Sequence, residues 1–291
     1  MRTLSMARYQ RHAVSLASPT TPFSLVYHEW LPDDGPGAGL PVFCVHGLTR
    51  NGRDFDALAQ WLADSGRRVI CPDVAGRGES DWLNNPAEYN NPNYGGHLLQ
   101  LIAQLGINHY DWVGTSMGGL IGMGIAAMPE AGMRRLVIND VGAVVPAAAL
   151  NRIGDYVGRD PAFKNIDALE AHLREVHAPF GPLTDAQWRH LATHSARQDG
   201  AMLRLAYDPN IAAAFSEMIE DDLELWAIWD SINRDCLLIR GAESDLLLPD
   251  TAKEMTERGP KAQLVEIEGC GHAPALMAED QITALVDWLN R

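Results

Sequence analysis

The chain has 291 residues, of which 46% are hydrophobic, and its 38 acidic and 23 basic residues give a formal net charge of −15. This length and composition fit one large domain with a substantial core, with or without an insertion. The acidic balance argues against nucleic acid or an anionic membrane surface as a partner. No apolar stretch is long enough to cross a bilayer, and the residues from Met1 lack the apolar run of a secretory signal, so we expect a cytoplasmic protein.

Strand patterns alternate with helix patterns through the first half of the chain. Each strand is a near-continuous apolar run, which is typical of parallel strands that are covered on both faces. The expected fold class is therefore α/β, with a mostly parallel central sheet and helices on both of its faces. The strands are expected at about 23–30, 41–46, 68–73, 110–113 and 135–141, and the helices at about 54–65, 94–105 and 119–128.

The alternation stops after residue 145. Residues 146–222 contain helical stretches and no convincing strand, and strand patterns then resume. A helical block between two strands is typical of a lid over the carboxyl edge of the sheet, where open α/β sheets place their sites. We therefore expect a core of residues 1–145 and 223–291 with an inserted helical cap of residues 146–222. The clearest later elements are helices at about 166–176, 185–198 and 280–289 and strands at 236–240 and 263–267.

The most informative segment reads Gly114-Thr115-Ser116-Met117-Gly118, between an expected strand and an expected helix. A sharp turn of this kind projects the serine hydroxyl from the sheet edge, and it requires flanking glycines because side chains there would collide with nearby backbone. The first free amides of the new helix point toward the atom that the hydroxyl attacks, so the Met117 N–H is a candidate oxyanion donor. The segment predicts a nucleophilic Ser116, with an inert serine in a glycine-rich corner as the alternative.

Two candidate partners of Ser116 follow later strands, in the order nucleophile, acid, histidine. Asp245 follows the strand expected to end at Arg240, and His272 follows the strand expected to end near Ile267. A serine hydroxyl is a poor nucleophile at neutral pH, so a histidine must take its proton during attack and return it to the leaving group. We expect His272 to do this and Asp245 to orient the imidazole.

With these motifs the chain resembles the α/β-hydrolase fold superfamily, in its serine-nucleophile branch with a helical cap. The resemblance is carried further by His46-Gly47-Leu48, at the end of a strand, and by the turn at 73–80, where the family usually has proline in place of Ala75. It implies that the backbone N–H of Leu48 is the second oxyanion donor. It also implies that Asp140, which follows another strand, is an alternative position for the acid.

Other candidate groups have simpler interpretations. His46 is expected to be structural, and Arg50, just beyond the oxyanion loop, is either a ligand for a substrate carboxylate or a solvated loop residue. His190 and His194 have the spacing of a zinc pair, but Leu191 stands where a zinc protease has its glutamate, which favours a surface pair. We expect no metal and no cofactor, and we interpret the four cysteines as reduced packing residues, because they form no Cys-x-x-Cys pair.

These residues predict a serine hydrolase, most simply a carboxylesterase that cleaves a small, largely apolar ester through an acyl-enzyme on Ser116. A carbon-carbon bond hydrolase of aromatic ring-cleavage products is an alternative, although such enzymes usually have asparagine in place of Thr115 and a larger residue in place of Ala273. A lactonase, a thioesterase and a non-catalytic small-molecule receptor are further alternatives. Dehalogenases and epoxide hydrolases of this fold are disfavoured, because they have aspartate in place of Ser116. The cap does not reveal the small-molecule substrate, and the oligomeric state is not readable from the sequence.

Overall fold

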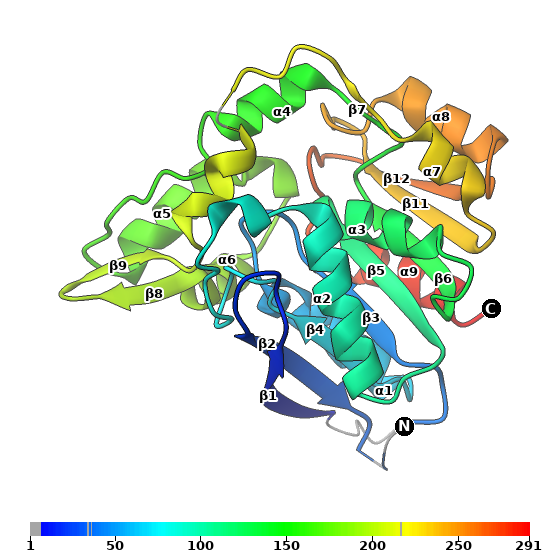
Figure 1. Cartoon of the computed structure of the whole chain (residues 1–291), viewed down its shortest axis with the longest axis horizontal. Coiled ribbons are helices and arrows are strands. Elements are labelled where there is room, and N and C mark those ends of the chain that lie inside the picture. The colour runs from blue at the N-terminus through cyan, green and yellow to red at the C-terminus, as the bar shows by residue number, and fades with distance from the viewer. Residues whose placement is uncertain (1–6, 34, 36, 216) are drawn as a thin grey trace.

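The computed structural model describes residues 7–33, 35, 37–215 and 217–291. Its centre is an eight-stranded sheet with the strand order β1-β2-β4-β3-β5-β6-β11-β12. Figure 1 shows helices in front of this sheet and behind it, which confirms the α/β class. The strands are β1 (Arg8–Leu16), β2 (Phe23–Leu31), β3 (Val42–Val45), β4 (Val69–Pro72), β5 (Tyr110–Thr115), β6 (Met133–Asn139), β11 (Asp235–Gly241) and β12 (Gln263–Ile267).

The sheet is mostly parallel, as expected, and its antiparallel part is confined to one edge. β1 pairs with β2 and β2 pairs with β4 in antiparallel fashion, whereas every later neighbour is parallel. The edge strand β1 was not expected from the sequence. Its residues are mostly exposed and polar, so it lacks the apolar run that marks the buried strands.

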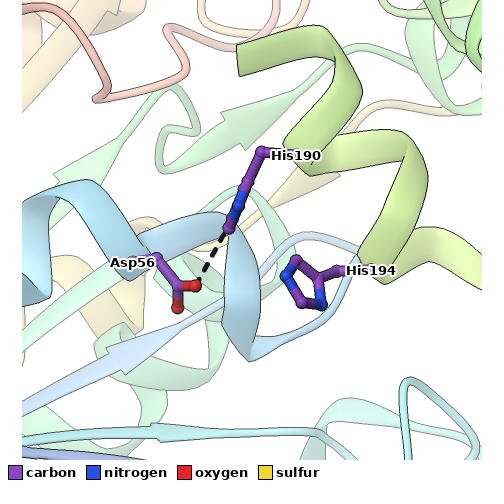
Figure 2. A group of neighbouring side chains, drawn as sticks. All are labelled: Asp56, His190 and His194. Atoms are coloured by element: carbon purple, nitrogen blue, oxygen red, sulfur yellow. Dashed lines mark ion pairs between the residues drawn. The ribbon is translucent and has the colours of Figure 1, made fainter. Parts of the chain in front are cut away.

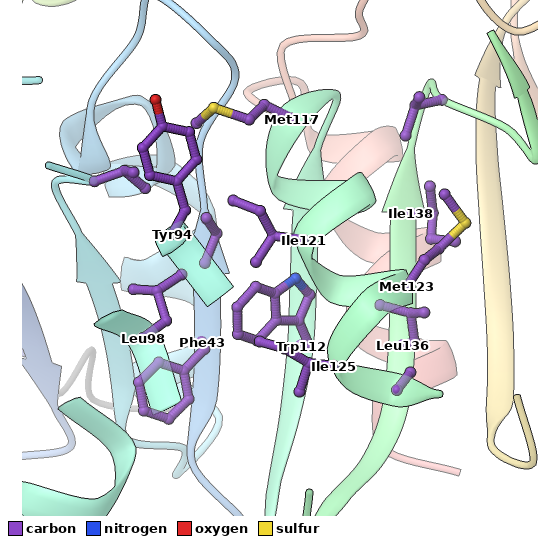
Figure 3. Packing of buried hydrophobic residues seen from close by; sticks show 14 of the residues in the cluster. Phe43, Tyr94, Leu98, Trp112, Met117, Ile121, Met123, Ile125, Leu136 and Ile138 are labelled. Atoms are coloured by element: carbon purple, nitrogen blue, oxygen red, sulfur yellow. The ribbon is translucent and has the colours of Figure 1, made fainter. Parts of the chain in front are cut away.

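Helices cover both faces of the sheet in two separate apolar layers. Leucines of α1 and α9 pack on one face with Val42 and Val113, and residues of α2 and α3 pack on the other face around Phe43 and Trp112. Figure 3 shows the second layer, in which the Trp112 ring lies between Phe43 and Ile121. The helices are α1 (Asp56–Asp64), α2 (Asn91–Gln104), α3 (Met117–Ala126), α7 (Trp226–Ser231), α8 (Pro249–Glu257) and α9 (Glu279–Leu289).

The turn between β5 and α3 has the conformation that its sequence predicts. Ser116 has φ +52° and ψ −113°, in a region that side chains rarely adopt. A Cβ atom on Gly114 would lie 2.2 Å from the carbonyl oxygen of Gly118, and one on Gly118 would lie 2.0 Å from the carbonyl oxygen of Val45. Both glycines are therefore required for helix α3 to start directly against the sheet.

The segment 146–222 is largely helical, but it also contains a hairpin. The expectation of no strand there is wrong, because β8 (Ala196–Asp199) pairs with β9 (Met202–Leu205) through a turn at Gly200, which has φ +57°. The hairpin also ends the preceding helix at Ser195, three residues before the expected end. The helical elements of this segment are α4 (Ala147–Gly154), α5 (Ile166–Val176), η3 (Ala178–Phe180), α6 (Asp185–Ser195) and η4 (Pro209–Phe215).

A short ribbon closes the base of this segment. β7 (Val144–Val145) pairs antiparallel with β10 (Leu223–Glu224), so the chain enters and leaves the segment side by side. In Figure 1 the segment lies to the left of the sheet and above it, in green and yellow. Across the described residues, none of the helices combines the length and the apolarity needed to cross a bilayer.

Candidate active site

Three side chains from separate strand ends form a continuous hydrogen-bonded chain. The Oγ of Ser116 lies 2.9 Å from the Nε2 of His272, and the Nδ1 of His272 lies 2.8 Å from the Oδ2 of Asp140. Because a carboxylate only accepts, Nδ1 carries the proton and donates it to Asp140, which leaves the Nε2 lone pair free to accept from the serine hydroxyl. This is the arrangement in which a histidine can remove the proton of a serine.

Asp140 is fully buried and held on both carboxylate oxygens. Its Oδ1 accepts the backbone N–H of Gly241 at 2.8 Å, and its Oδ2 accepts the hydroxyl of Ser244 at 2.6 Å as well as the bond from His272. Asp140 also has φ +61°, a left-handed conformation that turns the chain directly after β6. These bonds fix the carboxylate in position beside His272, where it can stabilise the imidazolium that forms when His272 takes a proton.

The structure corrects the expected acid. Asp245 does not reach His272: its side chain is 53% exposed and forms an ion pair with Arg152 at 2.7 Å. Gly241 at the end of β11 and Ser244 in the loop that follows hold Asp140, and this loop carries Asp245 to the surface. Asp140, the alternative position for the acid, is the carboxylate that contacts the histidine.

The strand order explains this outcome. β6 is the direct neighbour of β5 in the sheet, whereas β11 lies one strand farther away. The residues that end β5 and β6 are therefore in contact, and the Ser116 N–H donates to the carbonyl of Asn139, the residue before Asp140, at 2.9 Å. The order nucleophile, acid, histidine is kept along the chain.

The backbone around Ser116 presents the two amides expected as oxyanion donors. Met117 is the first residue of α3, and the loop that carries Leu48 reaches Ser116, since a Cβ atom on Gly47 would lie 3.8 Å from the serine Cβ. Within the described residues, neither the Leu48 N–H nor the Met117 N–H donates a hydrogen bond. These two N–H groups are therefore candidates for the donors that electrostatic stabilisation of an oxyanion requires.

His46 holds the oxyanion loop against the turn after β4. Its Nε2 accepts the Val74 N–H at 2.9 Å, so its Nδ1 carries the proton and donates to the carbonyl of Gly47 at 2.7 Å. Burial lowers the pKa of His46 to about 4, so the ring is neutral near pH 7. This geometry gives His46 a structural role, as expected.

The pKa of His46 predicts a loss of stability in mild acid. The unfolded histidine takes up a proton as the pH falls through about 6.5, whereas the folded one, with a pKa of about 4, does not. The contribution of His46 to the free energy of unfolding is therefore fully present above the unfolded pKa. It is lost as the pH falls below that value, and the loss levels off below pH 4. Between pH 7 and pH 5 His46 alone should lower the free energy of unfolding by about 2 kcal/mol.

Guanidinium chloride unfolding at these two pH values tests this expectation. The loss between pH 7 and pH 5 should be about 2 kcal/mol smaller in His46→Gln than in the wild type. The exposed His109 provides the control, since His109→Gln should keep the wild-type pH dependence. The same loss in His46→Gln and the wild type would show that His46 does not couple protonation to unfolding.

Arg77 is a buried support of the oxyanion loop that the sequence analysis missed. Its side chain is fully buried, its Nε donates to the carbonyl of Leu48 at 2.9 Å, and its guanidinium lies 4.7 Å from the centre of the Tyr94 ring. Its Nη2 lies 3.7 Å from the Sδ of Met117, so the arginine contacts both residues that carry the oxyanion amides. Arg77 stands in a polar turn of the sequence, where an arginine usually faces solvent, so nothing in the sequence indicated that its side chain is buried.

Arg50 lies near the site but is engaged elsewhere. It is buried, and its guanidinium forms a bidentate pair with Asp54 through bonds of 2.8 and 2.7 Å. The charge of Arg50 is thus already balanced by a carboxylate of the same loop region. Because Arg50 is buried, its interpretation as a solvated loop arginine is wrong. Arg50 could bind a substrate carboxylate only if Asp54 shared the guanidinium with that carboxylate.

The two histidines with zinc-like spacing are half-buried on α6, so they form a partly exposed pair that lies against Asp56. Figure 2 shows His190 pointing from α6 toward Asp56 of α1, with His194 beside it. One ligand atom from each of the three residues lies within 4.8 Å of the others. However, both oxygens of Asp56 already accept bonds of 2.6–3.0 Å from Arg53, and Nε2 of His190 lies 2.9 Å from the Arg53 carbonyl. A metal ion would have to displace a guanidinium, so this group fits an ionic link between α6 and the core better than a metal site.

All four cysteines are free and buried, as expected for packing residues. The Sγ of Cys270, two residues before His272, lies 3.6 Å from the Phe180 carbonyl oxygen and 3.8 Å from the Nε2 of Gln281. Burial raises the pKa of the Cys270 thiol, which keeps it in its unreactive protonated form.

A cavity of about 540 Å³ lies between the segment 146–222 and the loop after β3. A smaller hollow, lined by Gly47, Thr115 and Ala273 next to the reacting residues, shares the lining residue Arg50 with this cavity. Burial lowers the pKa of the lining residue His177 well below its usual value. Its volume suits a small molecule. The lining residues come from both parts of the chain: Thr49, Arg50, Tyr156, Arg159, Asp160, Pro161, His172, Leu173, Glu175, Val176, His177, Leu205 and Tyr207.

Comparisons with known proteins agree with this fold. The chain is 41% identical over 278 residues to a 3-hydroxybutyrate-oligomer hydrolase of Cupriavidus necator, which covers 92% of this chain and 94% of that protein. It is 27% identical over 248 residues to a 2-hydroxymuconate semialdehyde hydrolase of a Pseudomonas species, over 81% of both chains. The crystal structure of an alpha/beta hydrolase from Novosphingobium aromaticivorans is similar with a TM-score of 0.86 and 33% identity, over 98% of this chain and 99% of that one.

The family model described as "Alpha/beta hydrolase family" matches residues 42–287, which include Ser116, Asp140 and His272. This match spans most of the sheet and the whole inserted segment. The chain belongs to the alpha/beta hydrolase family.

Proposed function

We propose that this hydrolase is a serine esterase that forms an acyl-enzyme on Ser116. The observation that carries the proposal is the unbroken chain from the Ser116 Oγ through His272 to the buried Asp140, at 2.9 and 2.8 Å. In the first step the serine oxygen attacks the ester carbonyl while the Nε2 of His272 takes its proton. The new oxyanion accepts the N–H groups of Leu48 and Met117.

The second half of the reaction uses the same groups in reverse. The imidazolium of His272 gives its proton to the departing alcohol oxygen, so the C–O bond breaks and the acyl group remains on Ser116. A water molecule then enters, His272 takes one of its protons, and the hydroxide attacks the acyl carbon. The serine leaves with the proton returned from His272, and Asp140 keeps the imidazole oriented throughout.

We further propose that residues 146–222 form the cap of the site and that the substrate is a short oligoester of 3-hydroxybutyrate or a close relative. Residues of this segment line one side of the cavity of about 540 Å³, and the paired entry and exit strands β7 and β10 support the proposed boundaries. The 41% identity to a 3-hydroxybutyrate-oligomer hydrolase, over nearly the whole of both chains, supports an ester as the bond that is cleaved.

A carbon-carbon bond hydrolase is the second candidate, because a 2-hydroxymuconate semialdehyde hydrolase also matches over most of the chain. The lower identity of 27% and the presence of Thr115 and Ala273 at the two positions that usually differ in such enzymes favour the ester. Both reactions would use the same serine, so the substrate and not the triad separates them.

A direct comparison of substrates tests the proposed function. The purified protein should release 3-hydroxybutyrate from its linear dimer and trimer with a kcat/KM above 10⁴ M⁻¹s⁻¹, a common value for an enzyme with its own substrate. It should hydrolyse a ring-cleavage dienoate at least 100-fold more slowly. Faster cleavage of the dienoate would show that the enzyme cleaves a carbon-carbon bond and not an ester. Absence of hydrolysis of any ester would overturn the proposal.

A further inference from the structure

The arginines that line the cavity of about 540 Å³, or that pair with its lining residue Asp160, differ in their partners. Arg50 is paired with Asp54. Arg197 and Arg204 both bind Asp160, which lines the cavity, so this carboxylate is neutralised by two guanidinium groups. These charges are therefore balanced within the protein.

Arg159 lines the same cavity without such a partner. It lies just after α4, its side chain is exposed, and its guanidinium makes no ion pair or hydrogen bond with residues 7–33, 35, 37–215 and 217–291. Its backbone is fixed, because its N–H donates to the Tyr156 carbonyl at 3.3 Å and its carbonyl accepts the Tyr207 hydroxyl at 2.9 Å. Arg159 thus presents five free donors at the rim of the cavity from an anchored backbone.

The other titratable groups of the cavity do not neutralise the positive charge of Arg159. His177 stays neutral near pH 7, because burial and the neighbouring positive charges lower its pKa well below the usual range. Burial also lowers the pKa of His172. Glu175 is the remaining acid of the lining, and it lies beyond ion-pairing distance of Arg159. In a protein of net charge −15, an unpaired arginine beside the site gives an anionic substrate a local point of attraction.

We propose that Arg159 is a specificity-determining residue that binds the free carboxylate of the substrate, while an ester group of the same molecule reaches Ser116. The inference rests on the proposed function, in which the substrate is a hydroxyacid oligomer. Such an oligomer ends in one carboxylate, and the planar guanidinium of an arginine binds a carboxylate through two parallel N–H···O bonds. Arg159 would therefore favour hydroxyacid oligomers over neutral esters of the same length.

Two ligands that differ only in whether their carboxylate is free or methylated isolate the contribution of the carboxylate to binding. Binding of the linear 3-hydroxybutyrate dimer and of its methyl ester is compared by calorimetry on the non-cleaving Ser116→Ala protein, with and without Arg159→Gln. Loss of the charged pair should weaken binding of the free acid about 10-fold and leave the methyl ester within about 2-fold. In the protein with Ser116 intact, Arg159→Gln should raise KM for the acid by the same factor with little change in kcat.

Two control variants separate this role from a general loss of positive charge or of structure. Arg152→Gln removes an equal charge from the neighbouring helix α4, where Arg152 pairs with Asp245, and it should leave both ligands unchanged. Glu175→Gln removes the acid of the same cavity and should strengthen binding of the free acid, because it removes a carboxylate that repels the carboxylate of the ligand. Arg159→Lys should restore part of the affinity for the acid, because a lysine keeps the charge but not the bidentate geometry.

The outcome distinguishes this inference from the proposed function. If the wild type hydrolyses the methyl ester and Arg159→Gln weakens both ligands equally or neither, the assignment of Arg159 is wrong and the esterase remains. Failure of the Ser116→Ala protein to bind the free dimer would also overturn the assignment. Absence of ester hydrolysis in the wild type would overturn the proposed function itself.

Discussion

Replacement of Ser116 by alanine is expected to lower kcat for ester hydrolysis by about 10⁶-fold, the size of effect that follows loss of a serine nucleophile. The substitution removes the Oγ that lies 2.9 Å from the Nε2 of His272, and no other hydroxyl is bonded to that nitrogen in the described part of the chain. The residual rate should come from substrate binding and from the oxyanion amides of Leu48 and Met117. Initial rates with the 3-hydroxybutyrate dimer at high enzyme concentration measure this effect.

The fold should survive this substitution, since alanine keeps the Cβ and the turn is set by Gly114 and Gly118. Thermal unfolding followed by circular dichroism provides the control, with a midpoint expected within a few degrees of the wild type. A folded Ser116→Ala protein that keeps more than about 1% of the activity would contradict a covalent mechanism on this serine.

Replacement of Asp140 by asparagine is expected to lower kcat by about 10⁴-fold, because the amide cannot hold the same tautomer and charge of the imidazole. The Oδ2 of Asp140 accepts the Nδ1–H of His272 at 2.8 Å, and an asparagine amide in its place can donate to Nδ1 and reverse the tautomer. His272 would then present a proton to Ser116 in place of a lone pair. Steady-state kinetics across the pH range measure the loss.

Asp245→Asn is the matched control for this substitution. Asp245 has an exposed carboxylate paired with Arg152, and an exposed ion pair contributes at most about 1 kcal/mol to stability. The kcat of Asp245→Asn should therefore stay within about 2-fold of the wild-type value. The opposite pattern, with full activity in Asp140→Asn and loss in Asp245→Asn, would restore the acid that the sequence favoured.

The choice between these two acids shows where sequence reasoning stops. Both residues follow an apolar strand, and both precede His272 in the chain. What separates them is that β6 is adjacent to β5 and that Gly241, the last residue of β11, and Ser244, in the loop after it, both donate hydrogen bonds to Asp140. Strand adjacency and loop direction depend on non-local contacts, which periodicity and chain order do not encode.

Local chemistry was easier to read from the sequence. The turn at Ser116 was predictable because its glycines and its place between a strand and a helix are encoded within a few residues, and the close contacts of Gly114 and Gly118 are the physical reason. The buried parallel strands and the helices that cover them were predictable because each is a strong apolar pattern. The loss of strand patterns was the basis for predicting an inserted segment at 146–222, and the hairpin within these residues was missed.

The remaining features lacked a local signal. β1 and β8 are mostly polar and exposed or half-exposed, so their residues resemble loop sequence, and β9 is too short, at four residues, for its apolar pattern to mark a strand. The burial of Arg77 depends on the rings of Tyr89 and Tyr94 that pack around its guanidinium, 12 and 17 residues farther along the chain. Only the folded chain brings these groups together.

The most direct test of the covalent mechanism is intact-protein mass spectrometry after treatment with a fluorophosphonate, which reacts with activated serines. We expect one phosphonyl adduct per chain on the wild type, located on Ser116 by peptide mapping, because the His272 Nε2 at 2.9 Å activates that hydroxyl. Ser116→Ala should take up no adduct, and Asp140→Asn should react far more slowly. An adduct on another residue, or no adduct on the folded wild type, would contradict the mechanism.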